Sequence, residues 1–208
     1  MSAAVFVERL RQVGIVAVIR APSADSAVGM SRALVRGGVT GIEITFSTPN
    51  AASAIARARA ELPDALVGAG TVLNDAELSA AVDAGATFLV SPHTDEALLR
   101  RAQQLGVPFL AGALTPTEIV RAFSLGSPVV KVFPGSAVGP DYLKAVRGPL
   151  PHIPLMPTGG VDENNLADWL AAGAVAVGLG GNLARGTEEQ ITAAAQRVRA
   201  AFDAARAR

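Results

Sequence analysis

Several residue types that build common functional sites are missing or scarce in this chain of 208 residues. It has no cysteine, which excludes disulfides and thiolate metal ligands. It has only two histidines, His93 and His152, and they lie far apart in the sequence. Because zinc enzymes hold their metal with several imidazole or thiolate groups, this composition argues against a metal-dependent enzyme. We expect neither a metal site nor a bound cofactor.

The sequence also lacks any excess of charge of one sign. Its 18 basic and 18 acidic side chains give a formal net charge of zero, so we expect no binding to nucleic acid or to an anionic membrane. No apolar run is long enough to span a bilayer, and Glu8, Arg9 and Arg11 interrupt the apolar residues where a signal peptide would need a continuous core. We expect one cytoplasmic domain over residues 1–208 that acts on a small molecule.

Lysine is nearly absent too. Lys131 and Lys144 are the only two lysines, and the other sixteen basic residues are arginine. Arginine stays protonated and is a poor nucleophile, whereas a buried lysine can lose its proton and attack a carbonyl. Lys144 fits an exposed helix position, but Lys131 lies in "SPVVKVFPGSAVGP", where the apolar neighbours predict a short buried strand. A chemical role is therefore predicted for Lys131.

Strand-like and helical patterns alternate along the whole chain. Helix-start signals such as Thr115-Pro116-Thr117-Glu118 precede the helical windows, and glycines follow most of them. This repeat predicts the α/β class, as a single (β/α)8 TIM barrel with an N-terminal helix at its bottom; a doubly wound open sheet is the competing fold. The eight expected strands cover residues 14–20, 40–46, 64–70, 86–92, 107–112, 128–134, 153–160 and 174–181.

The two-residue period of a strand predicts which side chains point into the barrel. In "GIEITFS", Ile42, Ile44 and Phe46 share an apolar face that should pack against the helices, which leaves Glu43 pointing inward. The same reasoning predicts that the Lys131 side chain points inward. A purely structural ion pair between Glu43 and Lys131 is the alternative, but buried ion pairs contribute little net stability, so we favour a functional pair.

Glycine-rich segments close the seventh and eighth expected strands. They read "PTGGVDENN" and "GLGGNLARG". Loops at these two positions of a barrel often bind phosphate through backbone N–H groups, although either segment alone could be an ordinary tight turn. Arg20, at the end of "AVIR", is a third charged candidate near the same rim.

Seven segments together resemble the bacterial 2-keto-3-deoxy-6-phosphogluconate (KDPG) aldolases, a family that includes the 4-hydroxy-2-oxoglutarate (KHG) aldolases. They are "GIEITFSTPNA", "VGAGTVLN", "VSPHTDE", "TPTE", "VVKVFPGSAVGPDYLKAVRGP", "MPTGGV" and "VGLGGNL", in order between about residues 14 and 186. The resemblance implies a metal-independent class I aldolase with a barrel fold that is commonly a homotrimer.

The resemblance also implies roles for single residues. Lys131 matches the Schiff-base lysine and Glu43 the general acid–base. Ser47 and Arg20 are implied substrate-binding residues: Ser47 stands where some members carry an arginine for an anion, and Arg20 is the substitute for that arginine. The other implied contacts are substrate-binding Thr71, Pro92, Phe133 and Thr158, and phosphate-binding Gly159, Gly160, Gly180, Gly181 and Asn182.

The expected reaction is cleavage of KDPG to pyruvate and glyceraldehyde 3-phosphate through an imine on Lys131. Cleavage of 4-hydroxy-2-oxoglutarate to pyruvate and glyoxylate is a further expected activity. Three alternatives stay open: an aldolase for the galactonate epimer, a phosphate-binding barrel isomerase, and a non-catalytic barrel that binds sugar phosphates.

Overall fold

The computed structural model describes residues 2–207, apart from the side chain of Asn182. Strands and helices alternate as the sequence predicts. The strands are β1 (Ile15–Ile19), β2 (Gly41–Thr45), β3 (Leu66–Gly70), β4 (Leu89–Val90), β5 (Phe109–Leu110), β6 (Gly112–Ala113), β7 (Val130–Val132), β8 (Leu155–Pro157) and β9 (Val177–Leu179). The helices are α1 (Ala3–Val13), α2 (Ala24–Arg36), α3 (Ala51–Glu61), α4 (Asp75–Asp83), α5 (Glu96–Gln104), α6 (Pro116–Ser124), α7 (Gly139–Arg147), α8 (Leu166–Ala171) and α9 (Glu188–Arg206), with 3₁₀ turns η1 (Gly135–Ala137) and η2 (Gly181–Ala184).

Every strand pair is parallel, which confirms the α/β class. The hydrogen bonds define two curled sheets rather than one unbroken ladder: six strands in the order β5-β4-β3-β2-β1-β9, and three in the order β6-β7-β8. The expected fifth strand, 107–112, is divided at Ala111 into β5, which pairs with β4, and β6, which pairs with β7. A single bridge, Thr158 to Gly178, links the end of β8 to β9.

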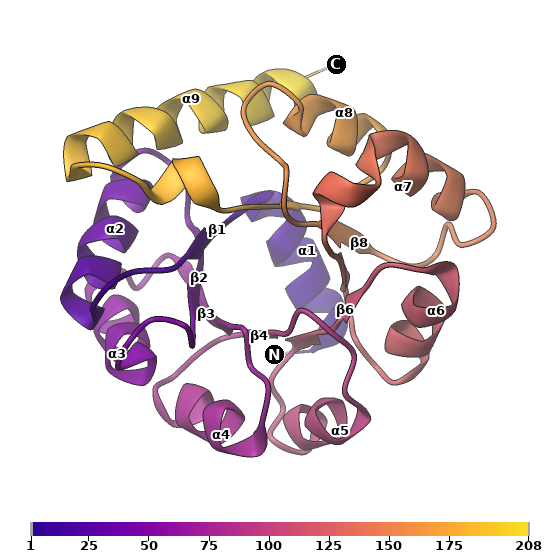
Figure 1. The fold of residues 1–208 in the computed structure, drawn as a ribbon, viewed down its shortest axis with the longest axis horizontal. Coiled ribbons are helices and arrows are strands. Elements are labelled where there is room, and N and C mark those ends of the chain that lie inside the picture. The colour runs from indigo at the N-terminus through magenta and orange to yellow at the C-terminus, as the bar shows by residue number, and fades with distance from the viewer. Residues whose placement is uncertain (1, 208) are drawn as a thin grey trace.

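The hydrophobic core has two parts, one on each side of the strands. The larger part lies between the strands and the surrounding helices, and it takes the outward-facing side chains such as Ile42, Ile44 and Val130. The smaller part lies inside the curve of the strands, where Phe6 and Leu10 of α1 pack with inward-facing side chains of the strands. Figure 1 shows α1 lying behind the curved strands. The predicted N-terminal helix is thus confirmed, and it covers one end of the strands.

The helix start predicted at Thr115 is also found. Thr115 and Glu118 form a reciprocal capping box at the start of α6, and Thr187 and Gln190 form another at the start of α9. Within residues 2–207, no helix combines the length and the apolar character needed to cross a membrane.

Candidate active site

Two oppositely charged side chains meet inside the curve of the strands. Lys131 extends from β7 and Glu43 from β2, and the Lys131 Nζ lies 3.8 Å from the Glu43 Oε1. Both side chains are almost entirely shielded from solvent, with exposed fractions of 4% and 0%. The inward direction predicted for both from the strand period is what brings them together.

Space for the Glu43 carboxylate comes from a glycine on the neighbouring strand. A Cβ on Gly70 of β3 would lie 2.0 Å from the Glu43 Oε1 and 2.6 Å from its Cγ, and both distances are too short for a real side chain. Any other residue at position 70 would displace the carboxylate. The sequence shows Gly70 only as part of "GAGT", so its contact with Glu43 is visible only in the structure.

The carboxylate of Glu43 is buried without a hydrogen bond. Neither oxygen has a hydrogen-bond partner among the described residues, and the Lys131 amine at 3.8 Å is beyond hydrogen-bond length. A buried charged group without hydrogen bonds costs several kcal/mol, and folded proteins rarely keep one without a use. The Glu43 carboxylate therefore keeps hydrogen-bonding capacity beside the Lys131 amine.

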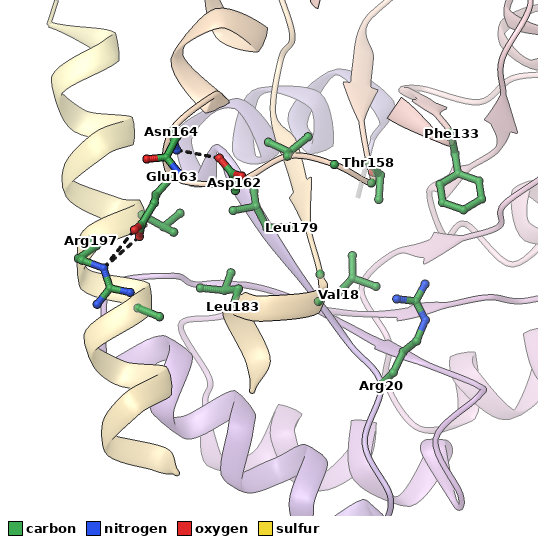
Figure 2. Close-up of a pocket in the computed structure, with 17 residues that line it drawn as sticks. Val18, Arg20, Phe133, Thr158, Asp162, Glu163, Asn164, Leu179, Leu183 and Arg197 are labelled. Atoms are coloured by element: carbon green, nitrogen blue, oxygen red, sulfur yellow. Dashed lines mark hydrogen bonds and ion pairs between the residues drawn. The ribbon is translucent and has the colours of Figure 1, made fainter. Parts of the chain in front are cut away.

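A cavity of about 530 Å³ opens beside this pair, at the carboxyl ends of the strands. Phe133 connects the two features, because it lines the cavity while its ring centre lies 5.2 Å from the Lys131 Nζ. Figure 2 shows Arg20 and Phe133 on one side of the cavity and an ion pair between Glu163 and Arg197 on the opposite side. Lys131 and Glu43 themselves are not among the described residues that line it.

Thr158 and Arg20 place polar groups in the cavity wall. The Thr158 hydroxyl is buried and has no hydrogen-bond partner in the described part of the chain. It lies close to β9, where a Cβ on Gly178 would be 2.3 Å from it. Arg20 is exposed, lines the cavity near Gly180, and forms no ion pair with any described carboxylate. Arg20 is thus exposed to the cavity, whereas the Thr158 hydroxyl is buried in its wall.

The predicted phosphate loops line the same cavity. Gly159, Gly160, Gly180 and Gly181 all belong to its wall. Gly159, Gly160 and Gly181 have φ angles of 89°, 74° and 59°, in the left-handed region that favours glycine. The side chain of Asn182 lies outside the described residues, although its backbone belongs to η2.

The other three predicted contacts, Thr71, Pro92 and Ser47, are not in the described lining of this cavity. Thr71 is half-buried and has a φ of 56°, a strained conformation for a β-branched residue. The carbonyl group of Pro92 packs against Gly112, which is the register partner of Lys131. Ser47 is exposed, and its hydroxyl lies 2.7 Å from that of Thr45. This contact joins the Ser47 hydroxyl to the last residue of β2.

Sequence reasoning missed the ion pair at the far side of the cavity. The Arg197 Nε donates to both carboxylate oxygens of Glu163, at 3.1 and 3.3 Å. Glu163 follows the glycine turn in "PTGGVDENN", whereas Arg197 lies on α9, 34 residues further on. The polar run after the two glycines was a signal for Glu163, but no local pattern points to Arg197.

Known proteins resemble this chain in sequence and in fold. The chain is 38% identical over 197 residues to the 2-dehydro-3-deoxy-phosphogluconate aldolase of Treponema pallidum, covering 91% of this chain and 93% of the relative. A structure described as native KDPGal superposes with a TM-score of 0.88 at 32% identity, covering 93% of this chain and 96% of the other. The KDPG aldolase of Legionella pneumophila, captured with pyruvate as a covalent carbinolamine intermediate, gives 0.81 at 30% identity, with coverages of 89% and 93%.

The parallel α/β fold and the buried lysine–glutamate pair, together with these relatives, define an aldolase, a carbon–carbon lyase. Residues 6–198 match the family described as KDPG and KHG aldolase. The chain belongs to that family.

Proposed function

We propose that this aldolase cleaves KDPG to pyruvate and glyceraldehyde 3-phosphate, with Lys131 as the Schiff-base nucleophile and Glu43 as the general acid–base. The observation that carries this proposal is the buried pair itself. The amine and the unpartnered carboxylate lie 3.8 Å apart inside the curve of the strands, where water is largely excluded. This arrangement provides a nucleophile and a proton acceptor for the same substrate.

The chemistry follows from the two groups. The neutral Lys131 amine attacks the C2 carbonyl of the substrate, and loss of water gives an iminium that withdraws electrons from C3. Glu43 takes the proton of the C4 hydroxyl as the C3–C4 bond breaks, and glyceraldehyde 3-phosphate leaves. The remaining enamine is protonated at C3, and hydrolysis of the resulting imine releases pyruvate and restores the amine.

Arg20 holds the substrate carboxylate in this proposal. It lies at the end of β1, lines the cavity, and has no ion-pair partner among the described carboxylates. A guanidinium matches a carboxylate with two parallel hydrogen bonds. Ser47, just after β2, is a further substrate contact in this proposal, and its hydroxyl lies 2.7 Å from that of Thr45. Thr71 and Pro92 border the reacting carbon atoms from the ends of β3 and β4.

The phosphate group binds at the glycine segments after β8 and β9. Gly159 and Gly160 from one segment, and Gly180 and Gly181 from the other, let the backbone approach an anion without interference from a Cβ. Asn182 belongs to the second segment and contributes its backbone. Thr158 lies between these segments and Phe133 (Figure 2), and its hydroxyl contacts the substrate in this proposal.

Two related substrates are candidates for the same site. The galactonate epimer differs only at C4, and the similarity to the native KDPGal structure supports it. The shorter 4-hydroxy-2-oxoglutarate gives pyruvate and glyoxylate, and membership of a family that includes KHG aldolases supports it. It lacks the phosphate, so it would use Lys131, Glu43 and Arg20 but not the glycine segments.

Residues 1–208 form one domain, and the two sheets are arcs of one (β/α)8 barrel. Two observations support closure: only Ala111 separates β5 from β6, and the bridge from Thr158 to Gly178 joins β8 to β9. A cytoplasmic location and a homotrimer complete the proposal, and the family resemblance supports the homotrimer.

The decisive experiment is chemical trapping. The protein is incubated with pyruvate and sodium borohydride, and the intact mass and the peptides are then measured. We expect one reduced pyruvyl adduct per chain, on the peptide that contains Lys131. An unmodified chain, or an adduct on the exposed Lys144 instead, would overturn the assignment of the nucleophile.

A further inference from the structure

The glycine turn after β8 depends on outside contacts for a defined conformation. Gly159 and Gly160 follow each other, both with positive φ. Glycine loses more backbone entropy on folding than any other residue, so two in succession need outside contacts to hold one conformation. Packing supplies one contact, since a Cβ on Gly160 would lie 2.7 Å from the Ser136 Cβ. A second contact comes from further along the same loop.

That second contact is the amide of Asn165, at the start of α8. Its Nδ2 donates to the carbonyl oxygen of Gly160 at 2.7 Å, and its Oδ1 accepts from the backbone N–H of Asp162 at 3.0 Å. One planar group therefore bridges the two backbone groups on either side of Val161. Asn165 is half-buried, and it is not among the described residues that line the cavity.

The bridge fixes the orientation of a peptide plane in the cavity wall. The carbonyl of Gly160 and the N–H of Val161 belong to one rigid trans peptide and point in opposite directions. Because Asn165 holds the carbonyl, the N–H of Val161 must point away from Asn165. Both Gly160 and Val161 line the cavity. Loss of the Asn165 amide would let this peptide rotate.

Asn165 also forms hydrogen bonds with the acidic residue that follows the turn. The Asp162 Oδ1 accepts from the backbone N–H groups of Asn164 at 2.8 Å and Asn165 at 3.2 Å, so Asp162 and Asn165 bond to each other's backbone reciprocally. Figure 2 shows the bond from Asn164 to Asp162. The nearby Glu163 is paired with Arg197. Both carboxylates next to the proposed phosphate site are thus held in hydrogen bonds, which limits their repulsion of an anion.

We infer that Asn165 is a positioning residue of the phosphate subsite, and that it sets the preference of the enzyme for phosphorylated over unphosphorylated substrates. It acts through the Gly159–Gly160 turn, without touching the substrate. The inference rests on the proposed function, because it takes the phosphate to bind at this turn. If Asn165 had only a structural role, its substitution would lower stability and would affect phosphorylated and unphosphorylated ligands equally.

The test compares Asn165→Ala with Gln103→Ala. Gln103 is a matched control, because its Nε2 also donates to a backbone carbonyl at 2.7 Å, that of Leu125, at the end of the molecule opposite the site. Three quantities are measured for each variant: KM and kcat for KDPG, the Ki of inorganic phosphate as a competitive inhibitor, and the rate of borohydride trapping with pyruvate. Thermal unfolding reports the stability of each variant.

For Asn165→Ala we expect KM for KDPG and the Ki of phosphate to rise together by about tenfold, the effect of one well-placed hydrogen bond. We expect kcat and pyruvate trapping to stay within about twofold of the parent, because neither reports on phosphate binding. Gln103→Ala should lose a similar amount of stability and change none of these constants. The milder Asn165→Ser, which keeps a hydroxyl for the N–H of Asp162, should fall between the parent and Asn165→Ala.

Two outcomes would overturn the inference. One is an Asn165→Ala enzyme with an unchanged Ki for phosphate. The other is an equal loss of trapping and of phosphate affinity in Asn165→Ala and Asn165→Ser, which would show a general structural role. Failure of the proposed function would be recognised separately, because the parent enzyme itself would then form no adduct with pyruvate.

Discussion

Lys131 and Glu43 meet although their strands belong to different sheets. β7 carries Lys131 in the three-stranded sheet and β2 carries Glu43 in the six-stranded sheet, yet the Lys131 Nζ lies 3.8 Å from the Glu43 Oε1. The contact therefore depends on the curvature of both sheets and not on pairing between neighbouring strands. A pair made in this way is sensitive to small changes in either sheet, which makes it a good target for substitution.

Lys131→Arg tests the nucleophile directly. The substitution keeps a cation next to Glu43 but replaces the amine with a guanidinium that stays protonated and does not form an imine. We expect turnover of KDPG to fall by several orders of magnitude and the borohydride adduct to disappear. Steady-state assays and intact mass measure the two effects.

Lys144→Arg is the matched control, because Lys144 is the only other lysine and is exposed on α7. Its turnover should stay within about twofold of the parent, as is usual for surface substitutions. Substantial activity in Lys131→Arg would contradict a Schiff-base mechanism at this residue.

Glu43→Gln tests the proton acceptor. Glutamine has nearly the same shape as glutamate but cannot take up a proton, so we expect kcat to fall roughly 10²–10⁴-fold with the fold intact. Single-turnover cleavage and circular dichroism are the measurements. Glu8→Gln, at an exposed position on α1, provides the control. A Glu43→Gln enzyme with the kcat of the parent would remove Glu43 from the chemistry.

Gly70→Ala tests the space made for the Glu43 carboxylate. The new Cβ would lie 2.0 Å from the Glu43 Oε1, so the carboxylate must move relative to Lys131. We expect kcat to fall at least about tenfold, and the free energy of unfolding to fall by about 1–3 kcal/mol, as for other overpacked interiors. Kinetics and urea unfolding measure the two effects.

Gly148→Ala is the control for Gly70→Ala. Gly148 has helical dihedral angles, and its nearest neighbour for a Cβ is the Ala145 carbonyl oxygen at 3.3 Å. It should leave kcat unchanged and stability within about 1 kcal/mol of the parent. If Gly70→Ala behaved in the same way as Gly148→Ala, the close fit around Glu43 would have no catalytic importance.

Strand periodicity was enough to predict the central pair from the sequence. The alternation in "GIEITFS" and "VVKVF" assigns Glu43 and Lys131 to the inner face, and Ile42, Ile44 and Val130 do pack on the helix side. Parallel strands put their carboxyl ends at one edge, which is why the glycine segments after the seventh and eighth expected strands line the same cavity as Arg20. These features follow from local pattern and simple topology.

Other features depend on close approach between segments that are distant in sequence, which local pattern cannot reveal. The contact of Gly70 with Glu43 and the pairing of Arg197 with Glu163 are of this kind. The break at Ala111 is another such feature, because it depends on the pairing of β6 with β7. The engagement of Ser47 with Thr45 is local, yet it depends on side-chain rotamers that the sequence does not specify.

Arg20→Ala tests which anion Arg20 binds. If it holds the carboxylate, the pyruvate concentration that gives half-maximal trapping should rise roughly tenfold to a hundredfold, since pyruvate carries this carboxylate and no phosphate. Arg20→Lys should give an intermediate value, because it keeps the charge but loses the paired hydrogen bonds. Arg121→Ala, on the exposed face of α6, serves as the control.

Unchanged pyruvate trapping in Arg20→Ala, combined with a raised KM for KDPG, would assign Arg20 to the phosphate instead. The two readouts thus separate the two anions of the substrate within one variant.

Glu118→Ala tests the capping box of α6 through its dependence on pH. The Glu118 carboxylate accepts hydrogen bonds from the backbone N–H groups of Thr115 and Leu114, at 2.8 and 2.9 Å, and these bonds lower the pKa of Glu118 below its ordinary value of 4.5. A lowered pKa in the folded state means that the ionised carboxylate stabilises the fold. This stabilisation is complete above pH 4.5 and is lost as the pH falls through the lower, folded-state pKa.

The melting temperature of Glu118→Ala should therefore lie below that of the parent at neutral pH, and the difference in melting temperature should narrow on acidification to about pH 3. Glu118→Gln keeps a neutral acceptor for the same N–H groups, so its melting temperature should differ less from that of the parent at neutral pH. A gap between the parent and Glu118→Ala that stays constant across this range would show that the charge of Glu118 contributes nothing to the capping box.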